Sequence, residues 1–209
     1  MSRDNSDTRR HILSAVEGML EKNHSSRDIR ISSVAQHACV SVQTIYYYFD
    51  SLAHLIAQAQ LAQYVRIAEP LHQFLVNAEL AILNSDETTF WKSIGDDLML
   101  AWSIGQEADG WHTSTLLFDI WSDDKTRCEF RKQVDVQIQR WMSVVELGKA
   151  RGWIDSEIDS GALISVCWAA VNGQSIFAFS SRMECSPESA RDFLLRASMS
   201  IGGFANENH

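Results

Sequence analysis

Seven residues beginning at Val42 combine an amide, a hydroxyl and three phenols over the length of one short helix. The Gln43 amide can form two hydrogen bonds with the edge of an adenine, and the methyl groups of Val42 and Thr44 can contact the methyl group of a thymine. Tyr47 and Tyr48 can donate hydrogen bonds to phosphates from the same helix. These residue types, this close together, favour contacts with nucleic acid.

Other groups near this stretch are suited to phosphate. The backbone N–H groups of Ser32 and Ser33 would begin the preceding helix, where the positive end of the helix dipole favours an anion. Arg3, Arg9 and Arg10 could reach the DNA backbone or the minor groove as an N-terminal arm. Both sets would position the protein on a duplex without reading its sequence.

Helices must position these residues, because apolar residues recur at helical spacing and no alternating strand pattern is present. Ser41 is expected to cap the helix that begins at Val42, and Tyr46 to anchor that helix against the core. Pro70 is expected to break or kink the chain, because it has no backbone donor. The expected helices span, in order, 8–22, 32–37, 42–48, 51–69, 71–83, 87–105, 110–122, 125–151, 160–181 and 187–204.

The predicted fold is all-α, with a three-helix helix-turn-helix domain at residues 1–52 and a larger helical domain at 53–209. The net charge of −9 would by itself argue against a nucleic-acid binder. The first 52 residues, however, hold six basic and six acidic residues, so the whole acidic excess lies in the larger domain. The domain at residues 1–52, which we call the head, is therefore neutral and can approach phosphate. DNA binding is expected to be weak, salt-dependent and dependent on the two heads of a dimer.

The stretch 30–56 resembles the DNA-binding head of the tetracycline-repressor (TetR) family of bacterial transcriptional regulators, and the head resemblance covers roughly residues 8–65. The stretch 116–134, Trp141 and residues 148–153 are similar, more loosely, to effector domains of many family members. The residues of the head that match the family pattern are Val34, Ala35, Val40, Ser41, Thr44, Ile45, Tyr46, Tyr48, Phe49, Ser51 and Leu55.

Two positions depart from the family pattern. Cys39 stands where glycine usually forms the turn, and a left-handed backbone there would cost on the order of 1 kcal/mol. Leu52 stands where a lysine usually follows Ser51, so one phosphate contact is missing. We expect either a modest affinity for DNA or replacement of the missing charge by Arg30 or the N-terminal arm.

The larger domain is rich in aromatic residues, since all seven tryptophans lie beyond residue 90. Ligand sites are mostly apolar and aromatic, although an ordinary core would explain the same residues. Few cations lie among them, so we expect a small hydrophobic effector that is neutral or cationic. Asp96, Asp97 and Asp119 could serve a cation, but solvated helix faces explain them equally well. The expected ligand-lining residues are Met99, Trp102, Trp111, His112, Leu116, Phe118, Trp121, Trp141 and Asn172.

The segment 160–181 is apolar on most sides and therefore needs to be covered. The resemblance implies that the last two helices of each subunit form a four-helix homodimer interface, with completion of the monomer core as the alternative. A dimer also suits an operator with two half-sites about one helical turn apart. The expected interface residues are Trp168, Ala169, Ala170, Gly173, Phe177, Phe193, Leu194, Ala197 and Ile201.

Motifs of enzymatic chemistry are absent from the sequence: there is no phosphate-binding glycine loop, zinc-protease motif or nucleophile elbow. The four cysteines lack zinc-site spacing, so we expect free thiols, no metal and no cofactor. The first residues lack the apolar core of a signal peptide, and the longest apolar run is about half a membrane span. We therefore expect a cytoplasmic protein with no membrane contact.

Together these features predict a ligand-responsive transcriptional repressor, not an enzyme, whose homodimer binds double-stranded palindromic operator DNA and is released by a small hydrophobic effector. Two alternatives stay open. The first is a DNA-binding regulator without a small-molecule effector, controlled by a partner or acting as an activator. The second is an all-α enzyme or lipid-binding protein with a vestigial helix-turn-helix.

Overall fold

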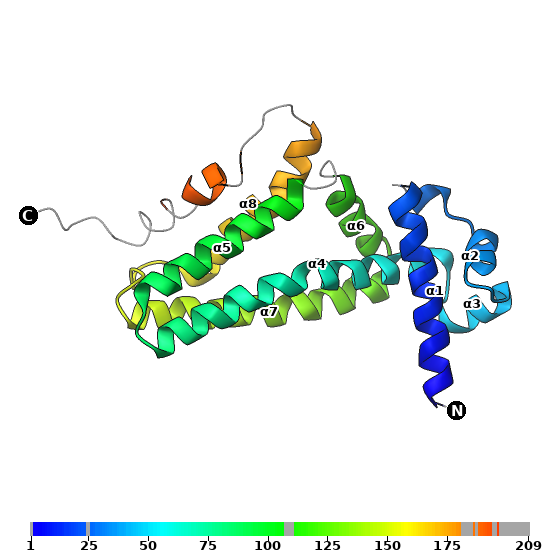
Figure 1. Ribbon diagram of the computed structural model, residues 1–209, viewed down its shortest axis with the longest axis horizontal. Helices are drawn as coiled ribbons and strands as arrows, with labels where there is room; N and C mark the ends of the chain where they lie inside the picture. The colour runs from blue at the N-terminus through cyan, green and yellow to red at the C-terminus, as the bar shows by residue number, and fades with distance from the viewer. Residues whose placement is uncertain are drawn as a thin grey trace, which may run out of the picture. The chain divides into compact units, whose positions relative to one another are not determined.

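The computed structural model describes residues 2–23, 26–106 and 111–180, together with 186, 188–193 and 196, and describes their side chains except at 2–5, 23, 104–106, 111–114 and 174–180. These residues form helices and no strand, which confirms the predicted all-α class (Figure 1). The elements are α1 (Ser2–Asn23), the short 3₁₀ helix η1 (Ser26–Asp28), α2 (Ile31–His37), α3 (Val42–Tyr48), α4 (Leu52–Leu83), α5 (Glu87–Gln106), α6 (Trp111–Ser122), α7 (Asp124–Ala150) and α8 (Ser160–Ser180).

Two compact units divide the chain, and the division passes through α4 and α7. Unit 1 comprises Met1–Ile67 and His112–Lys132, and unit 2 comprises Ala68–Trp111 and Gln133–His209. The three-helix head thus shares its compact unit with α6 and the first parts of α4 and α7. A functional boundary after residue 52 stays a prediction.

The apolar stripe of α1 forms the centre of the head in unit 1. Ile12 and Val16, four residues apart on that stripe, are completely buried. Ile45 of α3 and Phe49, just after it, join the same core with at most 1% of their surface exposed. Burying a side chain of this size stabilises the fold by about 1.5–3 kcal/mol. These two residues therefore fix where α3 sits.

A second apolar cluster of unit 1 joins α4, α6 and α7. Leu61 of α4 packs with Leu116 and Ile120 of α6. The rings of Tyr64 and Phe130 meet edge to face beside them, with centroids 4.9 Å apart. Burial raises the pKa of Tyr64 to about 12, because the phenolate would lose its hydration. Apolar contacts thus hold α6 and the start of α7 against α4.

The turn between α2 and α3 places Cys39 in the left-handed region, with φ at 50°. The N–H of Cys39 donates to the carbonyl of Gln36 at 3.3 Å, and the N–H of Val40 donates to that of Ala35 at 3.0 Å. Glycine is the usual residue where a helix ends in this way, because it has no Cβ to clash. The strain that the sequence predicted for Cys39 is therefore present.

Helix α4 continues without interruption from Leu52 to Leu83, so the predicted break at Pro70 and the separate helix 71–83 are wrong. A proline inside a helix removes one backbone donor, and here the carbonyl of Arg66 loses its usual partner. Ala68 and Leu75, on either side of Pro70, are both buried. Packing on both sides keeps the two halves in one helical register.

In unit 2, α5 packs along α8 (Figure 1). Buried side chains of α4 and α7 complete its apolar core. Phe90 of α5 is completely buried, and its ring lies 5.3 Å from that of Trp153, measured between centroids. Gly148 of α7 permits this packing, because a Cβ there would lie 2.9 Å from the side chain of Ile154. None of the helices described is long and apolar enough to span a membrane.

Helix α5 also carries two buried polar atoms that lack a hydrogen-bond partner among the described residues, namely Asp97 Oδ1 and Trp102 Nε1. Burial raises the pKa of the Asp97 carboxyl to about 7, because its charged form loses hydration. Buried polar groups are nearly always paired in folded proteins. Within the described residues, these two atoms depart from that rule.

Replacing Cys39 with glycine is expected to raise the free energy of unfolding by about 0.5–1 kcal/mol, because glycine adopts positive φ without strain. Cys39→Ala is the control, since it removes the thiol and keeps the Cβ. Denaturant unfolding of the three proteins measures the difference. Equal stability of the glycine and alanine variants would contradict strain at this turn.

Asp97→Asn is expected to stabilise the protein near pH 8 by about 2–4 kcal/mol and to have little effect near pH 4. The carboxyl has an ordinary pKa of 3.8 when unfolded and of about 7 when folded. Between these values the folded chain keeps a proton that the unfolded chain loses. The contribution of Asp97 to stability therefore falls as pH rises through this window.

Denaturant unfolding of both proteins at the two pH values checks the Asp97 prediction. The difference between variant and wild type isolates this one carboxyl from the others that titrate in acid. A stability gain of the same size at both pH values would show that packing, not ionisation, is responsible.

Candidate nucleic-acid interface

Helix α3 begins at Ser41, whose hydroxyl accepts a hydrogen bond from the backbone N–H of Thr44 at 3.0 Å. This confirms the predicted cap. The hydroxyls of Ser41 and Thr44 also bond to each other at 2.8 Å, which leaves the methyl group of Thr44 for apolar contact. The cap and the buried Ile45 together hold the first turn of α3 in a defined position.

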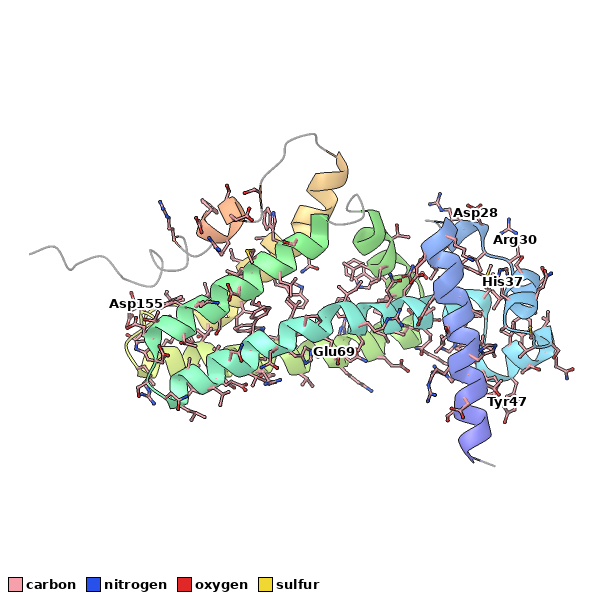
Figure 2. The ribbon with its side chains drawn as sticks, viewed as in Figure 1. Asp28, Arg30, His37, Tyr47, Glu69 and Asp155 are labelled. Atoms are coloured by element: carbon pink, nitrogen blue, oxygen red, sulfur yellow. The ribbon has the colours of Figure 1, made fainter. Side chains whose placement is uncertain are left out.

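The exposed residues of α3 form a surface, which we call the α3 surface: Val42, Gln43, Tyr46 and Tyr47. Val42 is 37% exposed, Tyr46 51% and Tyr47 73%, and Gln43 is exposed as well. Figure 2 shows Tyr47 at the outer side of the head. This surface offers an amide, an apolar group and two phenols, which suits base edges and phosphates.

The tyrosines of α3 differ in their roles from the prediction. Tyr46, expected to anchor the helix, is 51% exposed, so that expectation is wrong. Tyr48 packs against the head core instead, and its ring meets that of Tyr47 edge to face with centroids 4.9 Å apart. Positions three and four apart share a helix face, so Tyr48 lies on the side of the buried Ile45.

Helix α2 presents the two predicted serines in its first turn. Ser32 is exposed and Ser33 is half-buried, and Arg30 precedes them without a side-chain cap. The ring of His37 donates from Nδ1 to the carbonyl of Ser33 at 2.9 Å, which fixes the ring at the end of α2. Figure 2 shows Arg30, His37 and Tyr47 along the part of the head formed by α2 and α3.

The predicted N-terminal arm is not a separate segment but part of α1, which begins at Ser2 and contains Arg3, Arg9 and Arg10. Residues 2–7 include no glycine or proline that would stop the helix. Arg10 lies exposed and pairs with Asp7 at 3.0 Å. Helix formation thus holds these arginines on α1, and their contact with DNA stays a prediction.

Leu52, at the position where the family usually has a lysine, has a structural role. Leu52 begins α4 and packs against the head core. Arg30, one of its two suggested replacements, is exposed and donates to the backbone carbonyl of Arg27 at 3.0 Å. Its guanidinium is therefore held at the surface of the head, and its contact with phosphate stays a prediction.

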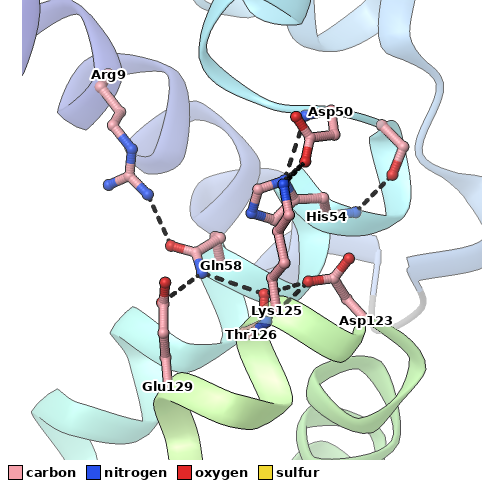
Figure 3. Close-up of polar contacts among 9 residues, drawn as sticks. Arg9, Asp50, His54, Gln58, Asp123, Lys125, Thr126 and Glu129 are labelled. Carbon is pink, nitrogen blue, oxygen red and sulfur yellow. Dashed lines mark hydrogen bonds and ion pairs between the residues drawn. The ribbon is translucent and has the colours of Figure 1, made fainter.

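A buried amide, Gln58 of α4, connects three helices of unit 1 (Figure 3). Its oxygen accepts from Arg9 Nη2 of α1 at 2.7 Å. Its nitrogen donates to Thr126 Oγ1 at 3.1 Å and to Glu129 Oε2 at 2.8 Å, both on α7. Thr126 in turn donates to Asp123 at 2.7 Å. The head helix α1 is thereby tied to α4 and α7.

The end of α3 is connected to α7 by a second set of polar contacts (Figure 3). The backbone N–H of Asp50 donates to Nδ1 of His54 at 3.2 Å, and the Asp50 carboxylate pairs with Lys125 of α7. The Lys125 ammonium holds the pKa of Asp50 below its usual value. Both charged groups are exposed, so this pair contributes orientation more than stability.

A third polar contact reaches α6. Asp119 accepts from the hydroxyl of Ser26 in η1 and from the amide of Gln60 in α4, each at 2.9 Å. Asp119 was a candidate for binding a cation, and in the structure both of its carboxylate oxygens accept hydrogen bonds from these two residues. Gln58 and Gln60 were not among the predicted residues, although two amides within an otherwise apolar stretch were a usable signal.

The expected ligand-lining residues fall in both units. In unit 2, Met99, Trp102 and Trp141 are half-buried, and Asn172 donates its amide to the carbonyl of Trp168 at 2.8 Å. The side chains of Trp111 and His112 lie outside those described. Within the described chain, no group of three or more His, Cys, Asp or Glu could hold a metal ion.

Three expected ligand residues with described side chains, Leu116, Phe118 and Trp121, belong to α6 in unit 1. Leu116 is buried in the apolar cluster with Leu61 and Ile120. Phe118 and Trp121 are 73% and 56% exposed, so they lie outside the core of unit 1 in the single chain, and their contact with a ligand stays a prediction. They lie on the side of α6 away from Leu116 and Ile120, which face the core.

The expected dimer residues follow α8 and the segment after it. Ala169 and Gly173 are exposed, whereas Trp168 and Ala170 are half-buried. Phe193 is 70% exposed. The side chain of Phe177 and all of Leu194, Ala197 and Ile201 lie outside the described residues.

No family model and no curated protein matches the sequence. Solved structures match over nearly the whole chain. A TetR transcription regulator from Haloarcula marismortui has a TM-score of 0.63 and 15% identity, covering 94% of this chain and 97% of its own. FadR of Bacillus subtilis, in complex with stearoyl-CoA, has a TM-score of 0.62 and 14% identity, covering 92% and 98%.

A protein from Saccharomonospora viridis, described as a transcriptional regulator and bound to choline, has a TM-score of 0.60 and 18% identity, covering 90% of this chain and 94% of its own. Identities this low establish the fold and not the activity. The order of helices and the helix-turn-helix at α2 and α3 agree with the sequence resemblance. This chain has the fold of the TetR-family transcriptional regulators.

Proposed function

We propose that this chain is a TetR-family transcriptional repressor that binds a palindromic operator as a homodimer and is released by a small hydrophobic effector. The α3 surface carries the proposal. Its side chains are exposed, while the buried Ile45 and the Ser41 cap hold the helix beneath them. A recognition helix works in this way, presenting its N-terminal residues to base edges in the major groove.

Each residue of the α3 surface has a role that its chemistry supports. Gln43 pairs with adenine, and Val42 and the methyl group of Thr44 contact thymine methyl groups. Tyr46 and Tyr47 donate to phosphates beside the groove. Phosphate contacts from Ser32, Ser33 and Tyr48 are secondary, because Ser33 and Tyr48 are half-buried.

The charge of the head limits its affinity for DNA. Arg9 is bound to Gln58, and its guanidinium lies 5.2 Å from the centre of the Phe49 ring, so it is not available to phosphate. Arg10 and Arg30 are the exposed guanidinium groups best suited to reach the backbone. With few cations per head, a single head binds weakly, and two linked heads gain through effective concentration.

The proposed dimer uses the exposed stripe of α8, which consists of Ala162, Val166, Ala169 and Gly173. These residues are spaced by four, three and four positions, so they share one helix face. Val166 is 62% exposed, and its neighbours on the stripe are small. Small residues allow two helices to approach closely, which supports isologous pairing of α8 with its copy.

The proposed effector follows from the composition of unit 2 and from the matched structures. The choline of the Saccharomonospora viridis protein and the stearoyl-CoA of FadR show that this fold accepts ligands with apolar parts. Unit 2 offers half-buried aromatic side chains, including Trp102 and Trp141. To release DNA, the effector must favour the free form by about 1–3 kcal/mol.

The contacts of unit 1 support a route by which α4 can move the head. Gln58 of α4 bonds to Arg9 of α1, and Asp50 beside α3 pairs with Lys125 of α7. A shift of α4 would therefore act on α1, and a shift of α7 would act on the end of α3. We propose that the effector changes the position of α4 and so the spacing of the two heads.

The purified protein is expected to retain specific genomic DNA fragments at low salt. Gln43→Ala should weaken binding to the retained fragment by about 5- to 150-fold, because one base contact made by two hydrogen bonds is lost. Tyr47→Ala should weaken it less, through one phosphate contact. Fluorescence anisotropy of the labelled fragment measures both.

Matched controls for this DNA experiment are Gln133→Ala on α7 and Phe118→Ala on α6, which remove exposed side chains far from α3 in sequence. Phe118 is as exposed as Tyr47, at 73%. Both controls should bind like the wild type. If no genomic fragment is retained, the regulator proposal fails and an all-α lipid-binding protein becomes the better account.

Val166→Asp is expected to convert the proposed dimer into a monomer, because it buries a charge in the α8 pairing. Val136→Asp on α7 is the control, since Val136 is exposed to nearly the same extent, at 64% against 62%. Sedimentation or light scattering measures the mass of each. A monomeric wild type, or a dimeric Val166→Asp variant, would show that α8 does not form the interface.

A further inference from the structure

The helix-turn-helix contains no acidic side chain, lysine or arginine. No Asp, Glu, Lys or Arg occurs from residue 31 to residue 49, a stretch that holds all of α2, the turn and all of α3. Arg30, directly before this stretch, donates to the carbonyl of Arg27 at 3.0 Å. Asp50, directly after it, is paired with Lys125. The α3 surface therefore consists of uncharged side chains.

This composition restricts which base pairs the α3 surface can read. Guanine is read mostly by Arg or Lys, whose donors reach its two acceptors, and the amino group of cytosine is read by Asp or Glu. Neither pairing is available from α3. The exposed amide of Gln43 instead matches the acceptor and the donor of adenine. His37, at the end of α2, donates from Nδ1 to the carbonyl of Ser33, so its neutral ring has only an acceptor left.

Thr44 is restricted further by its own hydrogen bonds. Its hydroxyl bonds to the hydroxyl of Ser41 at 2.8 Å, and its backbone N–H donates to the same oxygen at 3.0 Å. The hydroxyl is thus directed back to the cap, and the methyl group is the part of the side chain left for contact. Val42, which is 37% exposed, offers only methyl groups. Among the four bases, thymine alone presents a methyl group in the major groove.

We propose that the operator half-sites of this protein consist of A·T base pairs where α3 docks, read through an adenine paired with Gln43 and through thymine methyl groups packed on Val42 and Thr44. Ser41 is a positioning residue, because its hydroxyl decides which end of Thr44 faces the DNA. Contacts with methyl groups take the place of the charged base contacts that α3 lacks. This deepens the proposed function and rests on it, since it names the class of DNA that the regulator would bind.

The first experiment selects duplexes from a random pool with the full-length protein at low salt and sequences those that are retained. We expect two half-sites about one helical turn apart, each with required A·T pairs. Gln43→Ala should relax the preference at one A·T pair of each half-site and keep the others, which assigns that pair to α3. Phe118→Ala on α6 is the control and should keep the whole wild-type preference.

The second experiment replaces single thymines of a selected duplex with uracil, which pairs with adenine in the same way and lacks only the methyl group. At the thymines that α3 reads, uracil should weaken binding by about fourfold, the factor that corresponds to one buried methyl group. Uracil outside the half-sites is the control and should have no effect. Fluorescence anisotropy measures each duplex. A preference for A·T pairs that came from the shape of the duplex would survive removal of the methyl group.

A pair of substitutions separates the two ends of the Thr44 side chain. Thr44→Val keeps a methyl group and removes the hydroxyl, so it should bind within about twofold of the wild type and respond to uracil as before. Thr44→Ser keeps the hydroxyl and removes the methyl group, so it should bind about fourfold more weakly and lose the response to uracil at one thymine. Both variants retain the backbone N–H that Ser41 caps. Circular dichroism verifies that both are folded.

Three results would overturn this inference and leave the regulator proposal intact. The first is a selected half-site in which Gln43→Ala relaxes a G·C pair. The second is a duplex in which uracil has no effect at any thymine. The third is weak binding by Thr44→Val together with normal binding by Thr44→Ser, which would show that the hydroxyl makes the contact. Retention of no duplex at all is a different outcome, because it removes the proposed regulatory function and this inference with it.

Discussion

A buried amide must satisfy its oxygen and its nitrogen at once, and the way Gln58 does so organises unit 1. Its oxygen accepts from Arg9 of α1, and its nitrogen donates to Thr126 and Glu129 of α7. Moving any one of these helices leaves a polar atom unpaired in a buried place, which costs about 1–3 kcal/mol. Helix α1 of the head is therefore linked through α4 to α7. The apolar cluster around Leu61 holds α6 against the same part of α4.

These internal contacts determine which basic groups of the head remain available to DNA phosphates. Arg9 would be a natural phosphate ligand, yet its guanidinium is used internally by Gln58 and Phe49. The head is neutral in total charge, and its exposed face on α3 consists of uncharged side chains. Recognition by such a face depends on hydrogen bonds and apolar contacts with base edges. Long-range attraction contributes little to it.

Unit 2 differs from unit 1 in how its buried polar groups are treated. The amide of Gln58 has partners for both of its ends, whereas the Asp97 carboxylate and the Trp102 indole have none within the described residues. Natural proteins keep such unsatisfied groups mainly where something else binds them or where function requires them. The same unit exposes an apolar stripe on α8, which the proposed dimer would cover.

Features that depend on local interactions could be predicted from the amino-acid sequence alone. Helical periodicity predicted the all-α class, Ser41 was recognisable as a cap, and the family resemblance marked Cys39 as a residue in a glycine position. These features depend on neighbours a few residues away. Tertiary packing decided the rest. It kept α4 continuous through Pro70, turned Tyr46 outward and Tyr48 inward, and brought Gln58 to Arg9 across 49 positions in the chain. Burial and long-range pairing depend on which helices meet, and one helix's periodicity does not specify its partner.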